Sequence, residues 1–187
     1  MTQISPAIMG LDFGTTNTVA ALSRGDGESR LVDFAAPDGA GPVFRSALCF
    51  WEEESALGGV AKEAGPWAIA EFLDFPQGCR FIQSFKSVAA SASFEHATIF
   101  ERRLRFEELG HAFLDRLLAH GRSALTPVPE RIIVGRPVRY VGGRPDPALA
   151  RQRYDAMFAR LGRDVHYVYE PLGAAFSFAS RLTKQAT

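Results

Sequence analysis

The 187-residue sequence predicts an α/β fold, and two observations support that prediction. The first is a change of hydrophobic period, from short strand-like runs near the N-terminus to helical spacing in the last third of the chain. The second is the alternation of helical and strand-like segments after about residue 100, because strands separated by a helix normally pair in parallel. We therefore expect a mixed sheet flanked by helices.

Three short strands are expected near the N-terminus. Residues 7–13 are mostly apolar, and apolar character resumes at residues 19–22 after a polar interruption, which predicts two strands joined by a tight turn. Residues 24–27 (RGDG) have the composition of a turn. Residues 30–34 are then expected to form the third strand.

The middle of the chain differs in composition from both ends. Between residues 37 and 99, Gly and Pro are frequent and periodic runs are short, which predicts an inserted smaller lobe of α+β type. Within this lobe we expect a strand at 46–51 and a helix at 60–70. Residues 1–36 and 100–187 would together form the main lobe.

The last third is regular. One set of apolar residues recurs at helical spacing and predicts a helix that ends near Gly121. Its members are Phe106, Leu109, Phe113, Leu117 and Leu118. A second set predicts a helix that Gly162 stops. Its members are Leu149, Ala150, Tyr154, Met157, Phe158 and Leu161. Residues 131–135 and 165–169 are expected to be strands, and the Glu-Pro pair that begins at Glu170 is expected to open a final helix.

Composition narrows the possible functions. The chain is 47% hydrophobic and 22% charged, which is ordinary for a globular protein. Its 21 basic residues balance its 21 acidic residues, so no electrostatic footprint for nucleic acid or an acidic membrane is expected. No secretion signal or membrane span is evident, so we expect a cytoplasmic protein. Cys49 and Cys79 are then expected to be reduced, buried thiols, with a disulfide as the alternative. The four histidines lack the spacing of a zinc site.

Asp12 is the first candidate functional residue. It lies in an apolar strand and is followed at once by Gly14 and a run of small polar residues. A carboxylate there needs compensating donors or a cation. The glycine and hydroxyl groups suit phosphate oxygens, with Asp12 holding a hydrated divalent cation. The alternative is a β-turn in which these side chains bond only to their own backbone.

Several separated segments resemble one protein family. GLDFGTTNT (residues 10–18) resembles the first phosphate-binding motif of the actin, sugar kinase and heat-shock-protein ATPase superfamily, and most closely that of DnaK-type chaperones. VYEPLGAAFSFA (168–179) resembles the Glu-Pro-x-x-Ala-Ala stretch of those chaperones. LGGVAKEAG (57–65) resembles a Gly-x-x-Ala run of the family, and IIVGRPVRY (132–140) resembles its strand ending in a functional proline. GRPVRYVGG (135–143) is most similar to the YegD-like branch.

The resemblance implies a fold and a ligand. The fold would be a ribonuclease H-like, actin-type ATPase lobe with a mixed five-stranded sheet and the inserted smaller lobe. The ligand would be ATP or ADP with magnesium, with Asp12 organising the hydrated metal and Glu170 as a second acid near its water shell. The loop residues that would wrap the phosphates are Gly14, Thr15, Thr16 and Asn17. Glu170 has an alternative role as a carboxylate favoured by a helix N-terminus.

Two more residues match the family's coupling elements. Pro137 and Arg151 correspond to the proline and arginine that are thought to relay nucleotide state to the substrate-binding domain. The alternative is structural: a proline that closes a strand and a solvated arginine on a helix.

Two departures from the family pattern limit the expected activity. Cys79 falls at the family's lysine position, with Arg80 and Lys86 as the neighbouring cations. Since a cysteine cannot stabilise phosphoryl charge as an ammonium does, one of these cations substitutes or hydrolysis is slow or absent. The family's second phosphate hairpin is also not found before Thr187, so half of the nucleotide pocket is missing. We expect a fragment that is inactive alone.

The leading hypothesis is the N-terminal lobe of a DnaK-like chaperone ATPase. In the complete protein, a second ATPase lobe would finish the site, and hydrolysis would be coupled to binding of unfolded polypeptide or a co-chaperone. One alternative is a sugar or acetate kinase lobe of the same superfamily, which the Glu-Pro-x-x-Ala-Ala segment disfavours. The other is a non-catalytic interaction module that uses the apolar face of the last helix. The residues of that face are Leu172, Ala175, Phe176 and Ala179.

Overall fold

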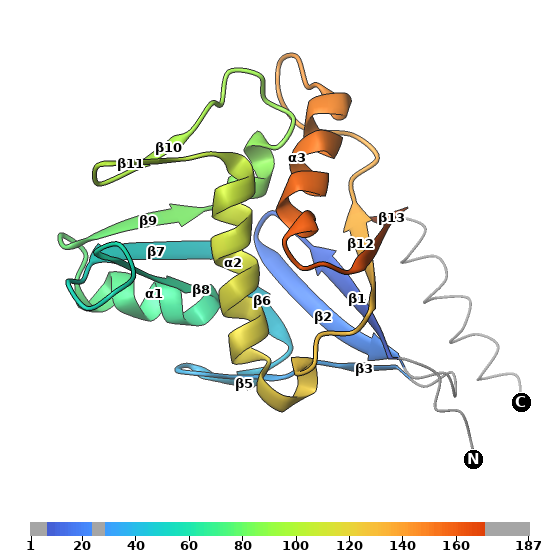
Figure 1. Cartoon of the computed structure of the whole chain (residues 1–187), viewed down its shortest axis with the longest axis horizontal. Coiled ribbons are helices and arrows are strands. Elements are labelled where there is room, and N and C mark those ends of the chain that lie inside the picture. The colour runs from blue at the N-terminus through green and yellow to red at the C-terminus, as the bar shows by residue number, and fades with distance from the viewer. Residues whose placement is uncertain (1–6, 24–28, 171–187) are drawn as a thin grey trace, which may run out of the picture.

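The computed structural model describes residues 7–23 and 29–170, and its centre is a mixed sheet (Figure 1). Three strands of this sheet run parallel, and they are β1 (Ile8–Phe13), β12 (Arg131–Arg136) and β13 (Asp164–Tyr169). Three more pair antiparallel, and they are β2 (Asn17–Ser23), β3 (Ser29–Leu31) and β6 (Val43–Arg45). The order is β13-β12-β1-β2-β3, with β6 pairing to β2. The predicted α/β class and mixed sheet are confirmed, although the sheet has six strands rather than five.

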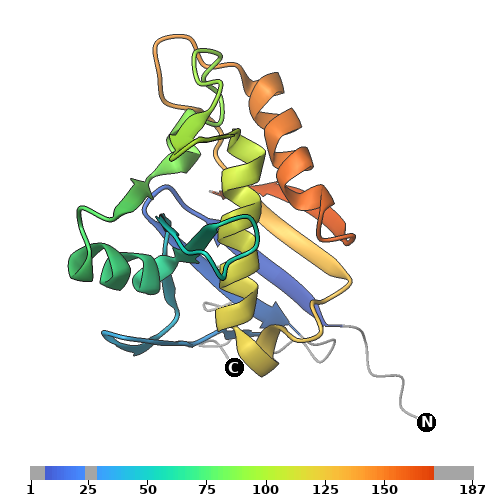
Figure 2. The same ribbon diagram turned by 60° about the vertical axis from the view of Figure 1, so that its left-hand side comes forward.

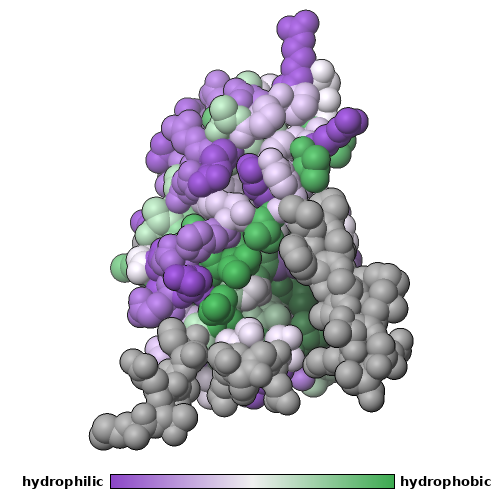
Figure 3. All heavy atoms as spheres, turned by 90° about the vertical axis from the view of Figure 1, so that its right-hand side faces the viewer, coloured by the Kyte–Doolittle hydropathy of each residue, from purple (hydrophilic) through white to green (hydrophobic). Residues whose placement is uncertain are grey.

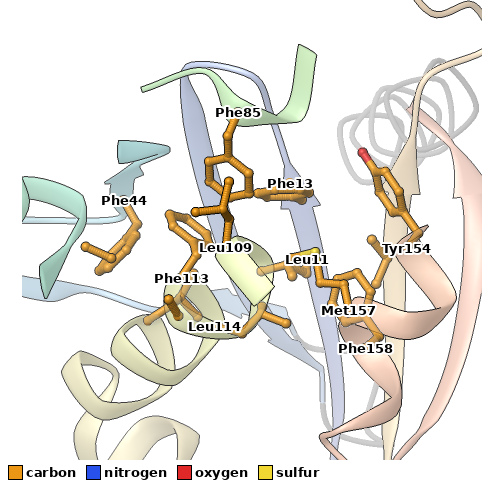
Figure 4. Close-up of a cluster of buried hydrophobic side chains, with 14 of the residues drawn as sticks. Leu11, Phe13, Phe44, Phe85, Leu109, Phe113, Leu114, Tyr154, Met157 and Phe158 are labelled. Carbon is orange, nitrogen blue, oxygen red and sulfur yellow. The ribbon is translucent and has the colours of Figure 1, made fainter. Parts of the chain in front are cut away.

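Two helices cover one face of this sheet (Figure 1). They are α2 (Phe106–His120) and α3 (Pro147–Ala159), and both were predicted from apolar periodicity. Side chains from the two helices and from β1 and β12 belong to one buried cluster. In Figure 4, Phe13 lies beside Phe85, and its ring centroid is 5.6 Å from that of Phe85 and 5.5 Å from that of Phe113. The core therefore fills the space under the end of β1.

A second, three-stranded antiparallel sheet lies on the other side of α2 (Figure 2). Its strands, in spatial order, are β8 (Val60–Ala64), β7 (Ala47–Glu52) and β9 (Cys79–Gln83). Helix α1 (Gly65–Asp74) packs on this sheet, and α2 contacts both β7 and β8. The buried cluster contains residues from this part and from the main sheet, so the two share one core. The division at residues 37–99 stays a prediction.

Smaller elements complete the described chain. There are two hairpins, β4 (Phe34–Ala36) with β5 (Gly39–Gly41), and β10 (Ala97–Ile99) with β11 (Arg102–Leu104). There are also two short 3-10 helices. The first, η1 (Phe85–Val88), comes after β9, and the second, η2 (Arg122–Leu125), comes after α2. The predicted third strand at 30–34 is divided between β3 and β4. The predicted final helix falls on residues from 171 onward, which lie outside the described part of the chain.

Two further features are the character of the helices and the exposure of strand β13. Within residues 7–23 and 29–170, no helix combines the length and apolar character that crossing a membrane requires. Figure 3 shows apolar surface on the side of the molecule where β13 lies in Figure 1, and Val168 and Tyr169 of this strand are 39% and 40% exposed. This edge strand thus presents apolar side chains outward.

The predicted helix at residues 60–70 is wrong in its first half. Residues 60–64 form β8, and the helix begins only at Gly65. Gly65 has φ +68°, a left-handed conformation, and a Cβ at this position would lie 2.6 Å from the Phe44 ring. The chain therefore turns sharply at Gly65, and Pro66 then occupies the first helical turn, where its missing N–H costs nothing.

Gly65→Ala is expected to destabilise the protein by about 2–5 kcal/mol. The change combines the cost of a left-handed alanine, roughly 1–2 kcal/mol, with overpacking against Phe44, roughly 1–3 kcal/mol. Urea unfolding measures the free energy of unfolding directly. Gly41→Ala is the control, because a Cβ there meets nothing within 4 Å and its effect should stay within about 0.5 kcal/mol. Equal effects of the two changes would contradict this account of the turn.

Candidate functional site

Three charged side chains converge near the carboxyl ends of the parallel strands. Asp12 lies on β1, Lys86 on the 3-10 helix η1, and Glu170 directly after β13. Lys86 Nζ is 2.6 Å from Glu170 Oε1. A Cβ on Gly135 of β12 would lie 3.3 Å from Glu170 Cγ and 3.6 Å from Asp12 Oδ1, so this glycine leaves the two carboxylates close together. The structure thus unites Asp12 and Glu170, which are far apart in the sequence.

The charges of this site are unbalanced. Two carboxylates face one ammonium group, and Lys86 is itself only 6% exposed, lying over the Phe13 ring. The pKa of Asp12 is raised, first by loss of hydration and then by the nearby negative charge of Glu170, while Lys86 acts in the lowering direction. A site with surplus negative charge, at which the Asp12 side chain is exposed, suits an added cation.

The loop after Asp12 is closed tightly on itself. The Gly14 amide donates to the Asp12 carbonyl oxygen at 3.1 Å, and a Cβ on Gly14 would lie only 2.2 Å from the carbonyl oxygen of Asn17. Glycine is therefore required at this position by close backbone approach. The side chains of Thr15, Thr16 and Asn17 are exposed, and they follow the end of β1, the strand that carries Asp12. Their hydroxyl and amide groups are accessible to a ligand with many oxygen atoms.

Two residues at the junction between β6 and β7, Arg45 and Ser46, hold this loop in place. The Ser46 hydroxyl donates to the Gly14 carbonyl oxygen at 2.7 Å and lies 2.9 Å from the buried Thr18 hydroxyl. The Ser46 amide donates to the Thr16 carbonyl oxygen at 2.8 Å, and Arg45 donates to Asn17 Oδ1 at 2.7 Å. Sequence reasoning missed both residues, because the only local signal was a small polar residue at the start of a predicted strand.

Arg153 fixes the segment that follows Lys86. Its Nη1 donates to the carbonyl oxygens of Val88, Ala89 and Ser91 at 2.9–3.0 Å, and its Nη2 donates to that of Phe94. A guanidinium that satisfies four carbonyl groups anchors this loop to α3. The sequence singled out the neighbouring Arg151 instead, since nothing in the pattern distinguishes the two arginines.

Lys86 is the cation that reaches the carboxylates. Arg80 is exposed and donates from Nε to the Thr98 carbonyl oxygen at 3.2 Å. Cys79 begins β9 and packs in a small cluster with Cys49 on the second sheet. Of the two cations predicted near the phosphates, the structure therefore brings only Lys86 to Asp12 and Glu170. Cys79 therefore lies apart from the carboxylates, and its correspondence to the family's lysine stays a prediction.

The two predicted coupling residues lie on different elements, Pro137 after β12 and Arg151 on α3. Pro137 directly follows β12 and is half-buried. Arg151 of α3 donates from Nε to both Asp155 carboxylate oxygens at 2.9 Å and stacks on the Tyr167 ring at 4.4 Å from its centroid. These contacts give Arg151 a structural role, and its coupling role stays a prediction.

The described part of the chain contains no metal site built from side chains alone. Among residues 7–23 and 29–170 there is no group of three or more His, Cys, Asp or Glu side chains that could coordinate a metal directly. Magnesium held through its water shell by Asp12, which the resemblance implies, stays a prediction.

The sequence matches no protein-family model, and it matches no curated protein.

Proposed function

We propose that this chain is the phosphate-binding first lobe of a DnaK-like chaperone ATPase with a ribonuclease H-like fold. The observation that carries the proposal is the convergence of Asp12, Lys86 and Glu170 at the carboxyl ends of parallel strands, beside a glycine loop. Ligands of α/β proteins bind at that end of the strands. The ligand would be Mg-ATP or Mg-ADP.

Each side chain has a distinct role in this proposal. Asp12 orients a water molecule of the magnesium shell, and the backbone and hydroxyl groups of residues 14–17 donate to phosphate oxygens. Lys86 offsets phosphate charge, and Glu170 holds the ammonium group in position through their 2.6 Å contact. Bound magnesium would supply charge neutralisation between neighbouring phosphates.

The complete protein would contain more than this chain. A second ATPase lobe would close over the nucleotide, and hydrolysis would be coupled to binding of unfolded polypeptide through Pro137 and Arg151. We further propose a cytoplasmic location, which the two free cysteines support, since free thiols persist in a reducing compartment.

Gly14→Ala tests the role of the loop. The Cβ must displace the Asn17 carbonyl group, so we expect Mg-ATP affinity to fall at least about tenfold, which corresponds to roughly 1.4 kcal/mol. Gly10→Ala, on the preceding strand β1, is the matched control, because its Cβ would meet only the Ala21 carbonyl oxygen at 4.0 Å. Titration of Mg-ATP into both variants measures the difference. Identical affinities would exclude this loop as the phosphate site.

A further inference from the structure

Two thiols lie side by side on the second sheet, away from the carboxylates. Cys49 of β7 is opposite Phe81 of β9, and Cys79 of β9 is opposite Trp51 of β7. The two cysteines are therefore diagonal neighbours, and they pack in the same cluster under α1.

The two thiols differ in access. Cys49 is fully buried, whereas Cys79 is partly exposed. Cys79 also lines a cavity of about 300 Å³. The other lining residues are Trp51, Glu52, Glu71, Phe75 and Gly78. A small oxidant can thus meet Cys79 directly, with Cys49 behind it.

The strands that carry the thiols also carry the supports of the carboxylate site. Ser46 directly precedes β7, and Ser84 directly follows β9. The Ser84 amide donates to the Ser46 carbonyl oxygen at 3.2 Å. Ser46 holds the Gly14 loop, and Ser84, at φ +57°, begins the turn that presents Lys86. A shift between β7 and β9 therefore reaches both parts of the site.

We propose that Cys79 and Cys49 are a reversible redox pair that responds to hydroperoxides. The Cys79 sulfur attacks the peroxide O–O bond, which gives a sulfenic acid on Cys79 and releases an alcohol, or water from hydrogen peroxide. The Cys49 thiol then attacks the Cys79 sulfur, forms the disulfide and releases water. The peroxide is reduced, and the two thiols are oxidised by two electrons.

Formation of this disulfide must move the strands. Diagonal neighbours on an antiparallel pair have Cα atoms about 7–8 Å apart, while disulfides usually span about 4.4–6.8 Å. The bond therefore draws β7 and β9 together, and its strain makes it easy to reduce. We expect the Ser84–Ser46 hydrogen bond to loosen or shift on oxidation.

Oxidation of the full chain with hydrogen peroxide tests the pair. After denaturing alkylation, the expected protein has lost two hydrogen atoms and carries no alkyl group on either cysteine, and peptide mapping links Cys49 to Cys79. Thiol reductant should restore both free thiols. A product with sulfinic acid on Cys79 and an alkylated Cys49 would overturn the proposal, as would two cysteines that stay alkylatable.

Single variants separate the two roles. Cys49→Ser should stop at the Cys79 sulfenic acid, which dimedone labels, and Cys79→Ser should remain unlabelled. Circular dichroism verifies folding, and Cys49→Ala replaces Cys49→Ser if the buried hydroxyl prevents it. Hydrogen exchange of the peptides around Ser46 and Ser84 should rise at least severalfold on oxidation of the wild type and stay unchanged in both variants. Unchanged exchange in the oxidised wild type would overturn the link to the site. None of these readouts uses nucleotide, so they are independent of the proposed ATPase function.

Discussion

Lys86→Met is expected to lower the free energy of unfolding at pH 7 by about 1–3 kcal/mol. Removing one partner of a fully buried ion pair typically costs roughly 3–5 kcal/mol, and the cost here is smaller because Glu170 is 35% exposed. Methionine keeps most of the packing against Phe13, so the loss reports the charge. Urea unfolding of the wild type and the variant measures it.

The free energy of unfolding that Lys86→Met loses should also depend on pH. Lys86 acts to lower the pKa of Asp12, so its removal leaves two carboxylates that repel each other and raises that pKa further. Protonation relieves this repulsion, so the destabilisation should shrink toward about pH 4. Lys62→Met is the matched control, since Lys62 is 37% exposed and its pair with Asp115 should contribute less than about 1 kcal/mol. A loss that is the same at both pH values would contradict the electrostatic account.

Asp12→Asn is expected to stabilise the ligand-free protein at pH 7. The folded-state pKa of Asp12 lies above its ordinary value of 3.8, because burial and Glu170 disfavour the charge. The folded state therefore binds a proton more tightly than the unfolded state, and stability falls as pH rises from 3.8 through the raised pKa. Asn removes this cost, so the gain should be present at pH 7 and absent at about pH 3, where Asp12 is protonated.

Thermal unfolding across this pH range measures the effect. Asp33→Asn, at an exposed position outside the site, is the control and should change stability by less than about 0.5 kcal/mol. A destabilised Asp12→Asn protein at pH 7 would show that the carboxylate is a structural hydrogen-bond acceptor, as in the β-turn alternative.

The same substitution should damage binding. A carboxylate that orients metal-bound water is an outer-shell partner, and loss of such a partner typically costs about 10–100-fold in affinity. Asp12 would then be a residue that the folded protein keeps at a cost in stability, which is the usual signature of a functional position.

Sequence periodicity predicted the main framework well. β1, β12 and β13 are short apolar runs, and α2 and α3 have apolar residues at clear helical spacing. Asp12 was a candidate because it is a carboxylate within an apolar strand, and Glu170 was one because of the family resemblance. The structure places the two together at the carboxyl ends of parallel strands. The strands and helices of this framework could be predicted because each depends on the spacing of apolar residues within one short segment.

What the sequence did not predict depends on contacts between distant residues. The turn at Gly65 is set by the ring of Phe44, and the Gly14 loop is held by Ser46. Lys86 was left undecided beside Arg80, because only the tertiary fold shows which cation reaches Glu170. Arg153 was missed for the same reason, since its partners are carbonyl groups more than 50 residues away.

Calorimetric titration of Mg-ATP into the chain tests the central claim most directly. The account predicts saturable heat that requires magnesium and that weakens about 10–100-fold in the Asp12→Asn variant. Titration of ATP without magnesium and of Mg-ATP into Asp33→Asn provide the controls. Absence of saturable heat with the wild type, or equal binding by the Asp12→Asn variant, would contradict the assignment of residues 12–18 as a phosphate site.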